Sequence, residues 1–325
     1  MTDLSTTYMG LKLRTPLVPS ASPLTQDFDN VRHLEDAGAS AIVFHSVFEE
    51  TSQNSKNKSG SGPSALDQYT GLVRKAREAV GVPVIASLGA SSRNGWIEYA
   101  RHIEQAGAHA MELNLYQVPS QADVVGTEIE NGYVDVVTTV KSAVKIPVAA
   151  KLTPFFTSMA NMARRFDHAG ADGLVLFNRF YQPDINLDAF EIQPSVLLSS
   201  PQSLRLPLTW IGMLFGRVKA SLAGSSGVHG ADDAVKLLLV GADVTMVCSA
   251  LLRNGISHLC SLETGLHGWM EKHGYKSVAE LKGKLSQIRC PDPAAFERAQ
   301  YINAVTGVGN LVVTGREAWK ILTGE

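Results

Sequence analysis

One hydrophobic pattern recurs four times along the chain. In each copy a helical stretch with one apolar face ends at a Gly-Ala turn, and a run of apolar residues follows, as in "FDHAGADGLVLFN". The apolar run is typical of a strand buried on both faces. A glycine at such a turn is typical of a helix C-terminus, where a positive φ is common. Each copy therefore predicts a helix end and then a buried strand, with turn glycines at Gly38, Gly107, Gly170 and Gly241.

Further apolar runs complete a count of eight strands. Residues 81–89, 145–153 and 217–227 lie between the repeats, and residues 16–22 precede the first one. Helix-like stretches such as "GWIEYARHIEQAG" separate most of the strands. Eight strands alternating with helices predict an α/β fold, a (β/α)8 TIM barrel. A doubly wound open sheet would show the same alternation, but the barrel is favoured because the count closes at eight.

Two segments interrupt this alternation, and a tail follows it. Residues 51–70 are rich in Ser, Asn and Gly and predict a loop over the second strand. Residues 180–216 are too long for a simple connection and predict an excursion that covers the site. We expect the barrel to occupy residues 1–290 and a C-terminal extension, residues 291–325, to pack outside it.

Composition narrows the functional classes. The 325 residues are 45% apolar and carry a formal net charge of −2, as in ordinary soluble proteins. Lys and Arg do not cluster, so we expect no nucleic-acid partner. We expect no signal peptide, because the first residues lack a basic stretch followed by an apolar core, and no apolar run approaches the roughly 20 residues of a membrane helix. The three cysteines and nine histidines form no CxxC, HxH or HExxH motif, so we expect a cytoplasmic protein with reduced thiols and no metal site.

Polar residues gather where the predicted strands end, which is where barrels place their chemistry. Lys151 is the cation of this ring and lies inside an apolar strand, where an unpaired ammonium is costly to bury. We expect Lys151 to face an electron-rich ligand. The alternative is an ion pair in the barrel core with Glu112, on the adjacent strand.

The stretch "LAGSSGVHGADDAV" predicts a phosphate site. Small residues leave the seventh strand, so backbone N–H groups can approach an anion at the start of the next helix. The turn "VCSALLRNG" after the eighth strand is similar, and barrels usually hold phosphate at these two strands. Cys248 in this second turn is interpreted as a lining residue rather than a nucleophile. No GxGxxG motif in a nicotinamide-binding context is present.

Taken in order, these segments resemble the dihydroorotate dehydrogenase family, especially its soluble class 1 enzymes, from about residue 8 to residue 288. The segments that carry the resemblance are "TPLVPSASPLT", "ELNLYQVP", "VAAKLTPFF", "LVLFN" and "GSSGVHGADDAVKLLLVGADVTMVCSALLRNG". The resemblance implies a barrel that binds FMN across its strand ends and oxidises a small-molecule substrate. It also implies a homodimer, whereas nothing in the sequence identifies the electron acceptor.

The resemblance assigns roles to the strand-end residues. It sets Lys151 against the flavin, where the lysine supports negative charge on the reduced ring. Asn114 and Asn178 are implied to bind the substrate. The residues expected to bind the cofactor are Ala21, Ser22, Ser46, Ser87, Asn114, Lys151, Gly224, Ser226, Gly227, Cys248 and Ser249.

The loop after the fourth strand departs from the family. The family motif is Asn-Leu-Ser-Cys-Pro-Asn, or has Ser in place of Cys, and this Cys or Ser removes a proton from dihydroorotate. Here the position is Gln117, whose amide cannot act as a general base. His45, Tyr116 and Ser120 are candidates to replace it, or they only line the site.

Three functions remain open at this stage. The first is an FMN-dependent oxidoreductase that converts dihydroorotate to orotate in pyrimidine biosynthesis. The second is a flavoenzyme for a different small substrate. The third is a non-catalytic barrel subunit of a redox assembly.

Overall fold

The chain divides into two compact units, Met1–Ser286 and Gln287–Glu325. The computed structural model describes residues 2–51, 63–180, 182–193 and 197–291, together with 293, 297, 301 and 302. Most of the loop predicted at 51–70 and most of the extension predicted at 291–325 therefore lie outside the described residues, and the division at residue 290 stays a prediction. No described helix is long and apolar enough to cross a membrane.

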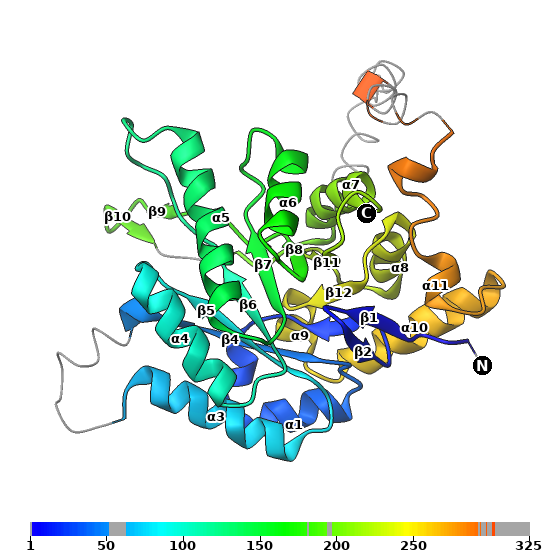
Figure 1. Cartoon of the computed structure of the whole chain (residues 1–325). Coiled ribbons are helices and arrows are strands. Elements are labelled where there is room, and N and C mark those ends of the chain that lie inside the picture. Colours follow the sequence, from blue (N-terminus) through cyan, green and yellow to red (C-terminus); the bar gives the residue numbers. More distant parts are fainter. Residues whose placement is uncertain are drawn as a thin grey trace. The chain divides into compact units, whose positions relative to one another are not determined.

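Eight parallel strands form the central sheet of the first unit (Figure 1), in the order β3-β12-β11-β8-β7-β6-β5-β4. The edge strands β3 and β4 lie side by side, because the Ser40 N–H before β4 donates to the Leu17 carbonyl of β3 at 3.2 Å. The sheet is thus nearly closed, and the predicted (β/α)8 barrel is confirmed. The strands are β3 (Leu17–Pro19), β4 (Ile42–Phe48), β5 (Val84–Gly89), β6 (Ala110–Asn114), β7 (Val148–Leu152), β8 (Gly173–Leu176), β11 (Ser221–Ser225) and β12 (Val244–Val247).

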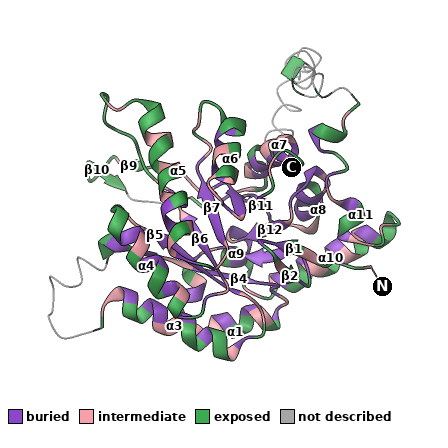
Figure 2. Ribbon diagram, viewed as in Figure 1, coloured by how far each residue is buried: buried purple, intermediate pink, exposed green. Residues whose placement is uncertain are grey.

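Helices surround this sheet, with buried faces toward the strands and exposed faces outward (Figure 2). The four turn glycines have φ between 86° and 120°, so the predicted helix ends are confirmed. The main helices are α1 (Phe28–Asp36), α3 (Ala65–Ala79), α4 (Arg93–Gln105), α5 (Gly126–Ala143), α6 (Met159–His168), α7 (Arg205–Leu214), α8 (Ala231–Val240), α9 (Ser249–Asn254) and α10 (His258–Lys272). Short helices are η1 (Pro23–Gln26), η2 (Pro201–Leu204) and α11 (Val278–Leu281), with η3 (Gln287–Arg289) in the second unit.

An N-terminal hairpin closes one end of the barrel. Its strands are β1 (Thr6–Tyr8) and β2 (Leu11–Leu13), which the sequence pattern did not predict. Tyr8 and Met9 are buried with the inward-facing apolar residues of the barrel strands. A Cβ at Gly173, the first residue of β8, would lie only 3.0 Å from Met9 Cγ, so the hairpin packs closely against the backbone of this strand. The barrel therefore opens toward the carboxyl ends of its strands.

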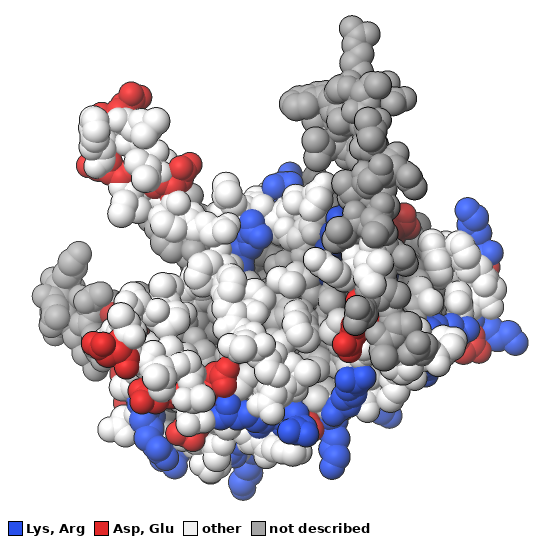
Figure 3. Space-filling view, turned by 90° about the horizontal axis from the view of Figure 1, so that it is seen from above, with Lys and Arg blue, Asp and Glu red and all other residues white. Residues whose placement is uncertain are grey.

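The segment between β8 and β11 is the predicted excursion. It contains an antiparallel hairpin, β9 (Asp184–Asn186) and β10 (Glu191–Gln193), followed by η2 and α7. On the molecular face seen in Figure 3, Lys and Arg side chains are interspersed with Asp and Glu.

Candidate active site

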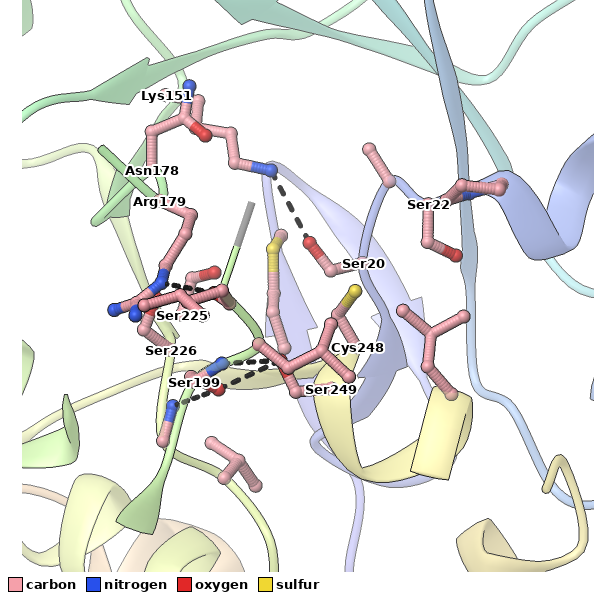
Figure 4. Close-up of a pocket in the computed structure, with 18 residues that line it drawn as sticks. Ser20, Ser22, Lys151, Asn178, Arg179, Ser199, Ser225, Ser226, Cys248 and Ser249 are labelled. Carbon is pink, nitrogen blue, oxygen red and sulfur yellow. Dashed lines mark hydrogen bonds between the residues drawn. The ribbon is translucent and has the colours of Figure 1, made fainter. Parts of the chain in front are cut away.

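A cavity of about 350 Å³ lies at the carboxyl ends of β3, β7, β8, β11 and β12 (Figure 4). Sites for small molecules begin at roughly this size, ~300 Å³. Residues 197–199 of the excursion also line the cavity, while coverage of the site by the whole segment stays a prediction. The predicted site residues that line the cavity are Ala21, Ser22, Lys151, Asn178, Ser226, Gly227, Cys248 and Ser249.

Lys151 is buried on β7 and lines this cavity. Its Nζ lies 3.1 Å from Glu112 Oε1 on β6, and it also donates to Ser20 Oγ at 3.4 Å. The ion pair that the sequence analysis ranked second is therefore present, which corrects the view of Lys151 as a cation reserved for a ligand. Glu112 Oε2 is buried and has no hydrogen-bond partner among the described residues. The lysine is thus held by one carboxylate oxygen at the floor of the cavity.

A row of polar side chains crosses the strand ends beside Lys151. Asn178 Nδ2 donates to Asn114 Oδ1 at 2.5 Å, and Asn114 Nδ2 donates to Ser46 Oγ at 3.3 Å. The row ends with the hydroxyls of Ser46 and Ser87, which lie 2.7 Å apart. Asn178 lines the first cavity, whereas Ser46 lines a second cavity of about 600 Å³ near the end of β4. The two predicted asparagines therefore lie together, at the boundary between two cavities.

The turn after β11 forms a cradle of small residues. Ser226 and Gly227 have φ of 79° and 82°, and a Cβ at Gly227 would lie 2.2 Å from the backbone nitrogen of Leu204. The Gly227 N–H donates to Ser199 Oγ at 3.2 Å, and the Ser199 and Ser249 hydroxyls lie 2.9 Å apart. Ser199 Oγ thus accepts the Gly227 N–H and itself donates to Ser249 Oγ, which also accepts the Ser199 N–H at 3.0 Å. Backbone N–H groups and a serine hydroxyl therefore donate to oxygen acceptors here, and a phosphate oxygen accepts the same kinds of bonds.

Cys248 lines the cavity as a thiol. Burial raises the pKa of Cys248, and the nearby charge of Lys151 opposes this shift only in part. A raised pKa disfavours the thiolate, which is the reactive form. The geometry is that of a lining residue.

Among the predicted residues that do not line the first cavity, His45 and Gly224 owe their positions to how β4 and β11 are built. Strand β4 has a bulge between Val43 and Ser46, which turns Ser46 rather than His45 toward Ser87. His45 instead packs against the rings of Phe44 and Tyr69, and burial lowers its pKa. In β11, a Cβ on Gly224 would point at Leu237 of α8, so Gly224 faces the helix layer.

The candidate bases on the loop after β6 also lie outside the first cavity. The ring of Tyr116 packs 5.8 Å from the ring of Phe180. Gln117 is exposed, and its backbone is hydrogen-bonded to Tyr133, whose pKa is raised chiefly by burial. Ser120 is exposed as well.

Several lining residues were not among the predicted site residues. Ser20 and Arg179 follow β3 and β8, and both could have been ranked higher from their strand-end positions. Ser199 carries no such signal, because its place in the cavity depends on how the excursion folds back. The sequence places Ser20, Arg179 and Ser225 at strand ends without assigning them a role. The lining residues that it missed altogether are Pro23, Leu197, Leu198, Ser199, Val228, Met246 and Leu252.

Comparison with known proteins agrees with this architecture. The family model for dihydroorotate dehydrogenase matches residues 46–270. The catalytic subunit of dihydroorotate dehydrogenase B (NAD(+)) of Thermoplasma acidophilum is 26% identical over 306 residues, which cover 87% of this chain and 99% of that protein. The corresponding subunit of Pyrococcus abyssi is 25% identical over 86% of this chain and 98% of its own length.

A third relative is named for a different activity. Subunit PreA of NAD-dependent dihydropyrimidine dehydrogenase from Escherichia coli is 24% identical over 315 residues, which cover 86% of this chain and 76% of that protein. The family match spans most of the barrel, including β5 to β12 and the cavity residues that follow them. This chain belongs to the dihydroorotate dehydrogenase family, a family of oxidoreductases that act on CH–CH groups.

Proposed function

We propose that the protein is an FMN-dependent oxidoreductase of the dihydroorotate dehydrogenase type, whose flavin binds in the cavity at the strand ends. The observation that carries this proposal is the cavity itself, in which buried Lys151 and the small-residue cradle around Gly227 line one space. A flavin mononucleotide needs both features, because its reduced ring gains negative charge and its phosphate is anionic.

The residues of the cavity fit such a cofactor. Ser226, Gly227 and Ser249 would hold the phosphate, since the backbone N–H of Gly227 already donates to an oxygen atom there. Ala21 and Ser22 on the far side have small side chains, which leave room for a flat ring. When bound, FMN would supply a hydride acceptor for the oxidation of a CH–CH bond.

The protein would contribute charge and orientation to this reaction. Lys151 Nζ is fixed by Glu112 and Ser20, so its position needs no adjustment when negative charge develops nearby. Asn114 and Asn178 would orient the substrate, because each amide both donates and accepts hydrogen bonds. Their mutual hydrogen bond of 2.5 Å fixes both side chains at the cavity boundary.

The substrate is the part of the proposal that depends on the loop after β6. An amide side chain at Gln117 takes no proton from a substrate near neutral pH. This observation favours a second candidate function, the oxidation or reduction of a small substrate other than dihydroorotate. If dihydroorotate is the substrate, the reaction would belong to pyrimidine biosynthesis.

An absorbance titration tests the proposal. Purified protein should bind FMN stoichiometrically, and dihydroorotate should bleach the bound flavin if dihydroorotate is the substrate. Flavin binding without bleaching would favour the second candidate. The substitution Gln117→Cys should then create dihydroorotate-dependent bleaching, with Gln117→Ser as the weaker variant and Gln117→Ala as the control. Protein that fails to bind FMN would refute the proposal.

We also propose that the protein works in the cytoplasm as part of an assembly. Two of the relatives are named catalytic subunits, which implies a separate partner for electron transfer. A homodimer is supported by four exposed apolar residues on or beside the β9–β10 hairpin, since such patches often mark interfaces. The residues are Ile185, Leu187, Phe190 and Ile192. Light scattering of the purified protein should give twice the chain mass of 34.9 kDa.

A further inference from the structure

Arg179 is a second cation in the cavity that holds Lys151. It follows β8 directly after Asn178, and its Nε donates to the carbonyl oxygen of Leu197 at 2.8 Å. No described residue is hydrogen-bonded to its two terminal nitrogens, and no acidic residue is among the described residues that line the cavity. Lys151, by contrast, is already paired with Glu112. Arg179 is therefore the lining cation without a counter-charge in the described part of the chain.

Arg179 lies on the phosphate side of the cavity. Leu197, which holds its Nε, is two residues from Ser199, whose hydroxyl accepts the Gly227 N–H at 3.2 Å. Figure 4 shows the Arg179 side chain running toward Ser225 and Ser226, whereas the Lys151 amine points toward Ser20. The two cations thus point to different parts of the cavity.

Among the described residues, no Lys or Arg side chain is hydrogen-bonded to the cradle around Gly227. Its hydrogen-bonding groups are a backbone N–H, serine hydroxyls and the ring of His229, whose Nε2 lies 3.4 Å from Ser199 Oγ. The pKa of His229 is lowered chiefly by burial, which favours the neutral imidazole. A phosphomonoester carries a charge of about −1.5 to −2 near neutral pH. A planar guanidinium with its Nε fixed by a carbonyl presents its remaining N–H groups in a fixed plane, which matches the oxygens of a phosphate.

We infer that Arg179 binds the cofactor phosphate and makes the cavity selective for a phosphorylated flavin over riboflavin. This inference rests on the proposed function, because it assumes that a flavin occupies the cavity. Because Arg179 lies next to Asn178, an anionic group of the substrate is a second possible partner for its charge. The experiment distinguishes the cofactor phosphate from the substrate anion.

FMN and riboflavin form a matched pair of probes, because they differ only in the phosphate. We expect the full-length protein to bind FMN more tightly than riboflavin in a flavin-fluorescence titration. The substitution Arg179→Gln should weaken FMN binding by roughly 10- to 100-fold and leave riboflavin binding unchanged, as expected for loss of a charge-assisted hydrogen bond. Arg179→Lys keeps the charge but not the planar fork, so it should recover part of the lost affinity.

Arg217→Gln is the control, because Arg217 is exposed and lies before β11, at the opposite end of the strand from the cradle. Thermal unfolding without flavin checks that each variant folds. If Arg179→Gln binds FMN as tightly as the parent protein does, or weakens FMN and riboflavin equally, the phosphate assignment is wrong while the flavin site stands. In that case a weaker response of the bound flavin to dihydroorotate would identify a substrate anion as the partner of Arg179. If the parent protein binds neither flavin, the proposed function fails and this inference fails with it.

Discussion

Removing one partner of the buried ion pair between Lys151 and Glu112 should destabilise the fold strongly, because the other charge would stay buried without a partner. Their side chains are only 8% and 1% exposed, and Nζ and Oε1 lie 3.1 Å apart. The substitution Glu112→Gln keeps the shape of the side chain but leaves the ammonium of Lys151 without its counter-charge. Breaking a buried pair in this way costs about 3–5 kcal/mol, because the remaining charge stays desolvated.

The size of the pair's attraction supports this range. At 3.1 Å, Coulomb's law gives about 5 kcal/mol for an effective dielectric constant of about 20. The Gln side chain can still accept a hydrogen bond from Lys151, which offsets part of the loss. With an unfolding entropy of about 2 cal/mol/K per residue, the unit Met1–Ser286 should lose about 5–8 °C in Tm for this change.

Thermal unfolding of flavin-free protein, followed by circular dichroism, measures the effect. The double variant Glu112→Gln, Lys151→Met should recover much of the loss, because no buried charge remains. Glu130→Gln is a matched control, since it removes a carboxylate from the partly exposed pair with Arg165 and should cost at most about 1 kcal/mol. A Glu112→Gln protein as stable as the parent would refute the reasoning.

Three further predictions concern the cavity and the strand ends. Gly227→Ala should destabilise the protein by about 2–4 kcal/mol and weaken FMN binding, because a Cβ there would lie 2.2 Å from the Leu204 nitrogen at a φ of 82°. Urea unfolding measures the stability and FMN titration measures the binding. An unchanged urea midpoint would contradict the clash. Burial lowers the folded-state pKa of His45, so the unfolded chain binds this proton more readily and the free energy of unfolding should fall as pH drops below about 6.5. His45→Gln should make the free energy of unfolding depend less steeply on pH between pH 8 and pH 5. The same pH dependence in both proteins would show that His45 is not buried in solution. Burial also raises the pKa of Cys248, so iodoacetamide at pH 7.5 should label exposed Cys260 roughly tenfold faster than Cys248. Mass spectrometry measures the two rates. Faster labelling of Cys248 would show that its thiolate is stabilised.

The barrel could be predicted from the sequence because its signals are local. A helix end, a glycine with positive φ and a buried strand recur within a few residues of each other, and Gly38 and Gly241 adopt the expected backbone. The N-terminal hairpin gave no such signal. Its two strands have three residues each, with one residue buried in each strand, and what buries them is contact with distant barrel strands.

Strand alternation predicted part of the site and misled in part. It turns Glu112, Asn114 and Lys151 to the same inner face, and the structure has them there. The same alternation in β11 turns Gly224 toward the helices, whereas the residues on either side of it face inward, so Gly224 should not have been assigned to the site. In β4 a single extra residue changes the phase, so His45 packs under Tyr69. A bulge of this kind depends on the neighbouring strand and cannot be inferred from the strand's own sequence.

The proposed flavin site and the loop that carries Gln117 lie in different places. The residues proposed to hold FMN line one cavity, whereas Gln117 is exposed on a loop outside it. Substitution of Gln117 should therefore change dihydroorotate oxidation without changing flavin binding. If the protein does oxidise dihydroorotate, a group other than Gln117 must take the proton. His45 lines the second cavity beside Ser46, and Tyr116 lies two residues beyond Asn114, the last residue of β6. These two residues are then the ones to replace first.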